Sequence, residues 1–185
     1  MRELSLHILD VVENGITAGG NCIWIEVEEA RKKDQLKIVI RDNGRGMPVE
    51  KMENINDPFI TSRTTRRVGL GLSLLAAASE RCDGTLRVDS QPGKGTEVEA
   101  IFRYTHIDRA PLGDMAATIT TLIMGNPGID IVYSHRIDGE EFELDTREIR
   151  TEMEDLSLSD PVVIHHLTES IRSALKELAS NENLS

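Results

Sequence analysis

The spacing of apolar residues changes abruptly near the start of the chain, and this change limits the folds that the chain can adopt. From Leu4 to Thr17 apolar residues recur every three or four positions, as on one side of a helix. After Gly19-Gly20 they recur at every second position over residues 22 to 28, as in a half-buried strand. A second alternating segment, residues 36 to 41, follows a short polar turn. The pattern predicts a two-faced helix followed by a β-hairpin.

The rest of the chain divides into two parts with different character. Up to Arg103 the order is a Gly-containing loop from Asp42 to Met47, a hydroxyl-rich basic segment, a helix over residues 70 to 82, and strands at 85–90 and 96–103. Beyond Arg103 the pattern predicts a helix, a hairpin turning at Asp138-Gly139 and a last helix that opens at Asp160-Pro161. We therefore predict a main domain, residues 1–103, and a small α-β-β-α extension, residues 104–185.

Charge and composition exclude several classes of protein. The net charge of −11 argues against a nucleic-acid surface, which requires an excess of Lys and Arg. Nothing near Met1 has the pattern of a signal peptide, and no run approaches the ~20 apolar residues of a membrane span. We expect a cytoplasmic protein without membrane or nucleic-acid partners. Cys22 and Cys82 lie far apart and are expected to be reduced core residues.

The first predicted helix carries a polar stripe that could bind a metal. Asp10 and Asn14 are four residues apart and lie on the same face, whereas Glu13 is rotated by about 100° from Asn14. An Asn oxygen suits Mg²⁺, which keeps waters and phosphate oxygens in its other positions. A carboxylate one turn away could orient or deprotonate a group that attacks the terminal phosphate. Taken alone, the pair is weak evidence, because Asp and Asn on an exposed helix face are usually just solvated.

The loop that begins at Asp42 could read a nucleotide base. A carboxylate at the end of a strand can accept a hydrogen bond from an exocyclic amino group, and adenine carries one. Gly44 and Gly46 would let the backbone approach a flat ligand where a Cβ would collide. By itself this loop could also be an ordinary Asn-Gly turn.

A third candidate site lies at the start of the helix over residues 70 to 82. Gly69-Leu70-Gly71 is placed where free backbone N–H groups and the helix dipole bind phosphate oxygens. The residues Thr61, Ser62 and Arg63 could add hydroxyl and cationic donors. By itself Gly-Leu-Gly could simply mark the start of a helix, but together the candidate metal ligand, base reader and phosphate loop, arriving in this order, are persuasive.

These motifs together resemble the GHKL superfamily, which is named for DNA gyrase, the heat-shock chaperones, histidine kinases and MutL. Residues 9–19 look like its N box, Asp42 to Met47 like its G1 box, and residues 57–62 like its F box. Gly69-Leu70-Gly71-Leu72-Ser73 is similar to the G2 box, and Gly93-Lys94-Gly95-Thr96 completes the pattern. The resemblance covers nearly all of residues 1 to 103.

The resemblance implies an α/β (α+β) two-layer sandwich of the Bergerat type, with a mixed sheet and helices on one face. It implies that Asn14 ligates Mg²⁺, that Asp42 reads the adenine amino group and that Thr96 supports the base. The residues that shape the ATP pocket would be Gly44, Gly46, Met47, Gly69, Leu70, Gly71 and Leu72, with Thr61, Ser62 and Arg63 in the lid. Where the gyrase and MutL branches have a Glu base, this chain has the shorter Asp10.

Three functions are compatible with this reading. The first is an ATP-dependent regulator that phosphorylates a separate protein or changes its binding to one. The second is an ATPase switch without phosphotransfer, in which the extension forms a partner or homodimer interface. The third is a binding module that does not hydrolyse ATP. Only a few residues precede the N box, so we expect no acceptor-His hairpin there and no complete autophosphorylating sensor kinase.

Overall fold

The computed structural model describes residues 3–48, 70–152 and 157–180. In chain order the elements are α1 (Leu4–Thr17), β1 (Cys22–Ala30), the 3-10 helix η1 (Arg31–Lys33), β2 (Gln35–Asp42), α3 (Leu70–Glu80), β3 (Thr85–Gln91), β4 (Gly95–Arg103), α4 (Met115–Gly125), β5 (Asp130–Ile137), β6 (Glu140–Asp145), α5 (Thr146–Glu152) and α6 (Pro161–Ser180).

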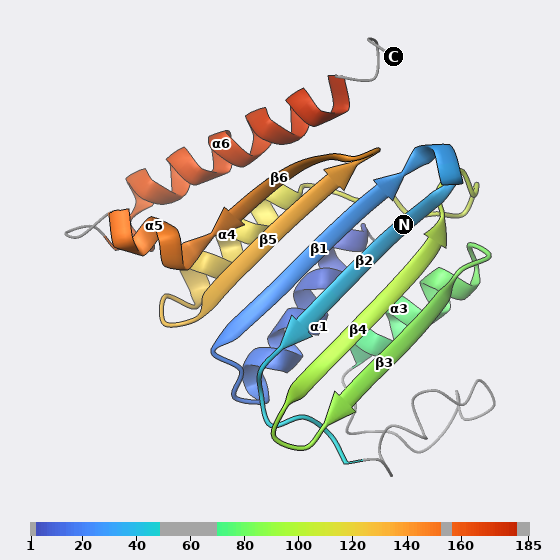
Figure 1. Cartoon of the computed structure of the whole chain (residues 1–185), viewed down its shortest axis with the longest axis horizontal. Helices are drawn as coiled ribbons and strands as arrows, with labels where there is room; N and C mark the ends of the chain where they lie inside the picture. The colour runs from blue at the N-terminus through green and yellow to red at the C-terminus, as the bar shows by residue number, and fades with distance from the viewer. Residues whose placement is uncertain (1–2, 49–69, 153–156, 181–185) are drawn as a thin grey trace.

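All six strands join one mixed sheet, in the order β3-β4-β2-β1-β5-β6 (Figure 1). The predicted hairpin of β1 and β2 is antiparallel, with Val27 opposite Ile38. On its other side β1 pairs in parallel with β5, where Val27 lies opposite His135. The C-terminal hairpin that the sequence predicts as part of a small module is thus a continuation of the main sheet. The boundary between residues 103 and 104 stays a prediction.

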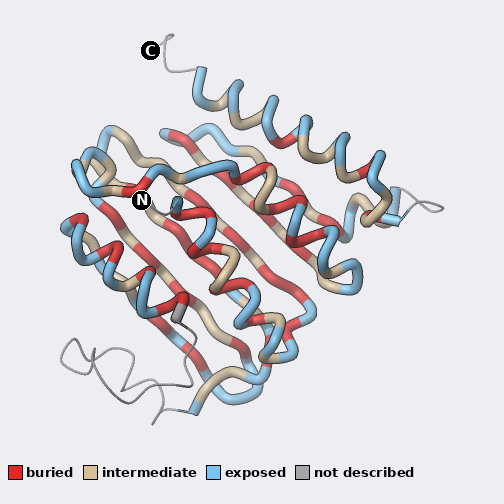
Figure 2. Tube along the Cα trace, turned by 180° about the vertical axis from the view of Figure 1, so that it is seen from behind, coloured by how far each residue is buried: buried red, intermediate tan, exposed pale blue. Residues whose placement is uncertain are grey.

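The helices cover one face of this sheet, which confirms the predicted α/β class. Seen from behind, α1, α3 and α4 lie side by side across the strands (Figure 2). The alternation in β1 explains the burial, because Ile23, Ile25 and Val27 point toward the helices and are at most 1% exposed. The opposite face carries charged residues, among which Arg41 bridges Glu26 and Glu97.

The first helix begins on the segment that links β4 to α4. The N–H groups of Leu4 and Ser5 donate to the carbonyls of Pro111 and Leu112, at 2.9 and 2.8 Å. A helix leaves its first N–H groups without intrahelical partners, so the linker satisfies two of them. The apolar stripe of α1 is buried, and Gly19 at φ +85° follows the end of the helix. The extension therefore fixes one end of α1.

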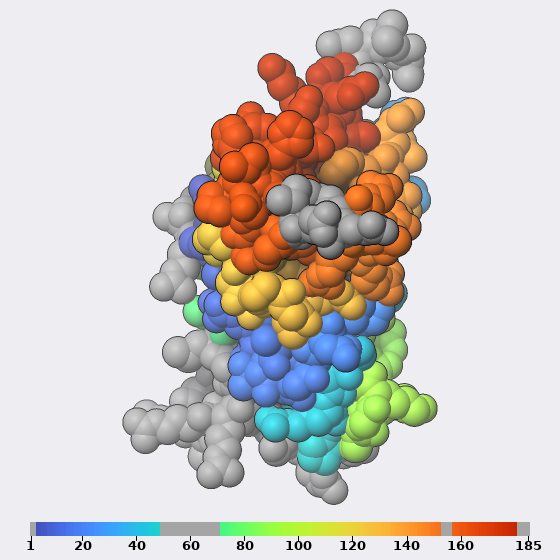
Figure 3. All heavy atoms as spheres, turned by 90° about the vertical axis from the view of Figure 1, so that its left-hand side faces the viewer, coloured from blue at the N-terminus to red at the C-terminus, as the bar shows by residue number. Residues whose placement is uncertain are grey.

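A buried polar chain also joins the extension to β1. The Tyr133 hydroxyl lies 2.7 Å from His135 Nδ1, and His135 Nε2 lies 2.9 Å from Glu29 Oε1. Tyr133 and His135 are at most 2% exposed, and both belong to β5. In the space-filling view the yellow-to-red C-terminal residues lie directly against the blue N-terminal ones (Figure 3). The extension is thus packed closely against the rest of the sheet.

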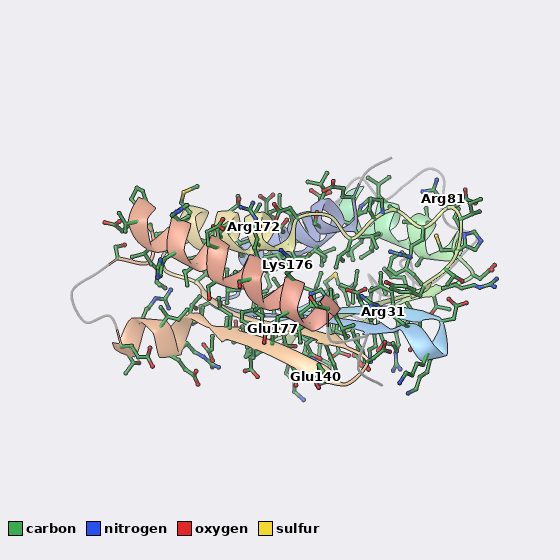
Figure 4. The ribbon with its side chains drawn as sticks, turned by 90° about the horizontal axis from the view of Figure 1, so that it is seen from above. Arg31, Arg81, Glu140, Arg172, Lys176 and Glu177 are labelled. Atoms are coloured by element: carbon green, nitrogen blue, oxygen red, sulfur yellow. The ribbon has the colours of Figure 1, made fainter. Side chains whose placement is uncertain are left out.

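Helix α6 closes the far end of the helical layer. Val163 and Ile171 are buried, and Arg172 donates to Asp114 Oδ2 at 2.8 Å, where Asp114 is the N-cap of α4 (Figure 4).

The sequence did not predict α5, a seven-residue and mostly polar helix. Within the described ranges, no helix combines the length and apolar character that crossing a bilayer requires.

Candidate functional site

Helix α1 presents Asp10 and Asn14 on the side away from its apolar stripe. Leu4, Ile8 and Val12 have no exposed surface, whereas Asp10 is half-buried and Asn14 is exposed. The two polar residues are one turn apart, so their side chains lie above one another on the helix. The helix therefore has a buried apolar face and a less buried polar face, as its sequence predicts.

The carboxylate of Asp42 stands at the end of β2, against α1. Its Oδ1 accepts a hydrogen bond from the N–H of Gly44 at 2.9 Å. A Cβ placed on Gly15 would lie 2.8 Å from the Cβ of Asp42 and 3.0 Å from its Oδ2. Only a glycine permits this approach, and Gly15 directly follows Asn14 in the helix. The base-reading candidate therefore lies where α1 crosses the end of β2, against the residue that follows the metal-binding candidate.

The surroundings of Asp42 perturb its protonation. Burial raises the pKa of this carboxyl above its ordinary value, because it removes water that stabilises the charge. The backbone N–H groups of Gly44 and Thr96 oppose this rise by favouring the charged form. A half-buried carboxylate that keeps oxygen lone pairs available is suited to accept hydrogen bonds from a ligand.

The loop after Asp42 is held from both sides. Arg45 donates its N–H to Ala18 O at 3.0 Å, and its own carbonyl accepts from Gly93 N at 2.8 Å. Gly46 has φ +64°, and a Cβ there would lie 2.0 Å from Gln91 O. Met47 donates its N–H to Ser90 Oγ at 2.8 Å. The loop is therefore fixed between the end of α1 and the β3–β4 turn.

The start of α3 lies directly against Asp10. Leu70 begins the helix, and a Cβ placed on Gly71 would lie 2.7 Å from the Cβ of Asp10. The second residue of a helix has a backbone N–H without an intrahelical partner. The carboxylate of Asp10 is thus placed beside a helix N-terminus of the kind that binds phosphate oxygens. Leu72 is 6% exposed and packs in the core.

Thr96 of β4 lies beside Asp42, because the two residues are paired in the β2–β4 register. On its other side Thr96 is paired with Ser90 of β3, and their hydroxyl oxygens are 2.9 Å apart. Gly95 has φ +93°, and a Cβ there would lie 1.8 Å from Asp42 O. Backbone contact at Gly95 thus brings Thr96 level with the carboxylate.

The structure brings together most of the residues that the sequence predicts for the site. Along α1, Asp10 lies against Gly71, and Gly15, the residue after Asn14, lies against Asp42; four others form the adjoining loop and strand, namely Gly44, Gly46, Met47 and Thr96. Of the other predicted residues, Leu72 packs in the core, and four lie outside the described ones, namely Thr61, Ser62, Arg63 and Gly69. For Leu70 only the backbone is described.

Two side chains that hold the site were not predicted. The Asn43 Oδ1 accepts from the N–H groups of Asn21 and Cys22 at 2.9 and 3.0 Å, which ties the loop to the turn before β1. Ser90 is 5% exposed and contacts the loop, the β3–β4 turn and Thr96. Ser90 follows Val88 on the core-facing side of β3, so a polar residue at an inward position was the available signal.

The donor groups limit how a metal could be held. Within the described ranges, no three His, Cys, Asp or Glu side chains gather as a metal site. An exposed amide oxygen at Asn14 and a carboxylate at Asp10 supply few protein ligands. Magnesium bound to phosphates needs few, because it keeps several waters and takes oxygens from the nucleotide. The donor set therefore fits a magnesium ion that arrives with a nucleotide.

Comparison with known proteins agrees with this geometry. A family profile described as histidine kinase-, DNA gyrase B-, and HSP90-like ATPase matches residues 2–106. The chain is 28% identical to sporulation kinase C of Bacillus subtilis (strain 168) over an alignment of 100 residues. This alignment covers 54% of this chain and 23% of that protein. The chain is 36% identical to the sensor protein kinase FleS of Pseudomonas aeruginosa over an alignment of 105 residues, and this alignment covers 57% of this chain and 25% of FleS.

The alignments with these two kinases cover only part of each protein, whereas a solved structure matches the fold over more of this chain. The matched part spans about a quarter of the length of the two kinases. A crystal structure described as the N terminal domain of a DNA repair protein superposes with a TM-score of 0.52 at 16% identity. It covers 78% of this chain and 53% of that one, so the shared fold extends beyond residue 106.

Proposed function

Because the chain belongs to the histidine kinase-, DNA gyrase B-, and HSP90-like ATPase family and so contains an ATP-binding domain, we propose that it binds Mg-ATP at the site formed by α1, the loop after Asp42 and the start of α3. With this nucleotide it acts on a separate protein, either as a protein kinase or as a switch whose binding depends on the nucleotide. The cytoplasmic location stays a prediction.

One observation carries the proposal, namely the double contact of α1. At Gly15 the helix touches Asp42, and one turn earlier, at Asp10, it touches Gly71. A ligand that fills the space beside this helix therefore meets a base-reading carboxylate at one end and a helix N-terminus at the other. A nucleoside triphosphate has the matching order of chemical groups, an amino-bearing base followed by phosphates.

Each residue has a separate role in this proposal. Asp42 accepts from the amino group of adenine, and Thr96 supports the same base edge. The backbone N–H groups at Leu70 and Gly71 receive phosphate oxygens. Asn14 and Asp10 face the phosphates, where Asn14 would hold the magnesium ion and Asp10 would orient the attacking group. The ion, when bound, would neutralise charge that develops on the phosphates.

A second function is an ATPase switch without phosphotransfer. It is favoured by the fixed attachment of α1 to the linker at Pro111 and Leu112, because this attachment places the extension next to the nucleotide-binding helix. A module that only binds ATP remains a third alternative, because Asp10 has a shorter reach than a Glu base.

Labelled ATP distinguishes these functions. The protein is incubated with magnesium and γ-labelled ATP, alone and together with proteins that co-purify with it. Label on a second protein supports a kinase, phosphate release without an acceptor supports a switch, and binding without either supports the third alternative. Calorimetry that detects no association with Mg-ATP would refute all three.

Two substitutions test the roles at the site. Asp42→Asn should abolish nucleotide binding, because the amide presents one acceptor oxygen in place of two. Asp89→Asn is the matched control, since Asp89 is exposed and lies in β3, two strands from Asp42, on the opposite face of the sheet. Asp10→Asn should spare binding and remove turnover, with Glu13→Gln on the same helix as its control. Full turnover in the D10N variant excludes Asp10 as the base.

A further inference from the structure

Ser90 makes three contacts through one buried hydroxyl group. The N–H of Met47 lies 2.8 Å from Ser90 Oγ, the carbonyl oxygen of Gly95 lies at 2.9 Å and Thr96 Oγ1 also lies at 2.9 Å. The side chain is 5% exposed, so these partners, rather than water, decide the direction of its proton. Ser90 therefore touches the loop after Asp42, the β3–β4 turn and the neighbour of Asp42 at the same time.

Counting protons fixes the direction of each bond. A serine hydroxyl has one proton and two lone pairs. A carbonyl oxygen can only accept, so the Ser90 proton goes to Gly95 O. The N–H of Met47 occupies one lone pair of Ser90. The third contact is then satisfied only if Thr96 donates its own proton to the second lone pair.

Thr96 therefore presents lone pairs to whatever binds beside it. Its proton points back to Ser90, and its partner in the sheet is Asp42, whose carboxylate also accepts hydrogen bonds. Two adjacent acceptors match a ligand edge that carries an amino group with two protons. They disfavour binding of a ligand edge that carries an oxo group, because two acceptors then face each other and neither receives a hydrogen bond.

We infer that Ser90 is a positioning residue that directs the Thr96 hydroxyl and thereby gives the site its preference for a 6-aminopurine over a 6-oxopurine. The inference rests on the proposed ATP site and adds to it the residue that determines base selectivity. Without Ser90 the Thr96 proton is free to turn toward the base and to donate to an oxo group. Selectivity then falls even though Thr96 and Asp42 are unchanged.

The test compares binding of ATP and inosine triphosphate, which differ at position 6 of the purine. Calorimetry with magnesium gives the ratio of the two dissociation constants for the wild type and for Ser90→Ala. The wild type should favour ATP, and Ser90→Ala should reduce the ratio about three- to tenfold, the range expected for one neutral hydrogen bond. Unfolding without nucleotide shows whether each variant is folded. If the alanine variant is not folded, Ser90→Cys replaces it, because a thiol is only a weak hydrogen-bond donor and acceptor.

A double-mutant cycle separates this role from a purely structural one. In a Thr96→Val background no hydroxyl remains to be directed, so Ser90→Ala should leave the ratio unchanged. Thr96→Ser keeps a hydroxyl and should keep the wild-type ratio. An unchanged ratio in folded Ser90→Ala, or an equal fall in the Thr96→Val background, overturns the inference while the ATP site stands. A wild type that binds neither nucleotide overturns the ATP site itself.

Discussion

Replacing Gly71 by Ala tests the contact between α3 and α1. The added Cβ would lie 2.7 Å from the Cβ of Asp10 and 3.6 Å from its Cγ. Non-bonded carbon atoms prefer about 3.5–4.0 Å, so the two helices must separate by roughly 1 Å at this point. Such overpacking costs about 1–3 kcal/mol, whereas Gly to Ala within a helix gains about 0.8–1 kcal/mol. The net loss of unfolding free energy should be about 0–2 kcal/mol.

The effect on turnover should be much larger than the effect on stability. A displacement of about 1 Å at a reacting group can lower a rate by roughly 100-fold. Since Asp10 is the residue that must move, Gly71→Ala should lose most of its ATP turnover while it stays folded. Urea unfolding followed by circular dichroism gives the first quantity, and single-turnover assays with labelled ATP give the second.

A second glycine provides the control for this experiment. Gly125 ends α4 and has no heavy atom within 4 Å of a built Cβ, so Gly125→Ala should leave turnover unchanged and should gain up to the helix-propensity increment in stability. If Gly71→Ala gained the full helix-propensity increment and kept wild-type turnover, the close approach of α3 to Asp10 would be refuted. The proposed role of Asp10 would lose its structural basis at the same time.

Three further predictions concern stability and pH. Gly95→Ala should lower the unfolding free energy by about 2–5 kcal/mol in urea titrations, because its Cβ would meet Asp42 O at 1.8 Å and its φ of +93° is unfavourable for alanine. Asp42→Asn should hold or raise the stability of nucleotide-free protein, since burial raises the pKa of Asp42 and the native state therefore takes up protons more readily. The contribution of Asp42 to wild-type stability therefore falls as pH rises through that pKa, so the excess of the D42N unfolding free energy over that of the wild type, measured by urea unfolding from pH 3 to 7, should grow with pH. For Glu29, burial alone would raise the pKa, but hydrogen bonds from His135 and Tyr104 and the Arg31 charge hold it below its usual value. Its contribution is complete above the unfolded pKa of about 4.5 and is lost at lower pH, so Glu29→Gln should flatten the acid limb of the same titration.

The sequence predicts the local elements well because each depends on nearby residues. The helix from Leu4 to Thr17 is confirmed with its predicted ends, since its apolar spacing and the following Gly-Gly are both local signals. The parallel pairing of β5 with β1 was not predicted. It joins Cys22 to Asp130, and no short window of sequence reveals a pairing of residues so far apart in the chain. Helix α5 was missed because its mostly polar sequence has no apolar period.

The candidate site shows the same difference between local signals, which the sequence reveals, and long-range contacts, which it does not. Asp42 and Gly71 were found because their motifs occur in a recognisable order, while their proximity to α1 appears only in the folded chain. Ser90 was missed because a single serine in a strand has no motif, and its importance comes from three partners that only the sheet register brings together. The segment from Thr61 to Arg63 stays a prediction.

The attachment of α1 to the linker allows this helix to transmit movement from one of its ends to the other. Its first two N–H groups are bonded to Pro111 and Leu112, and Asn14 and Gly15 lie near its other end. Fourteen helical residues span about 21 Å and bend little over that length. A tilt forced on the helix at one end must therefore reappear at the other. The extension from residue 104 would then sense whether phosphates are present without touching them.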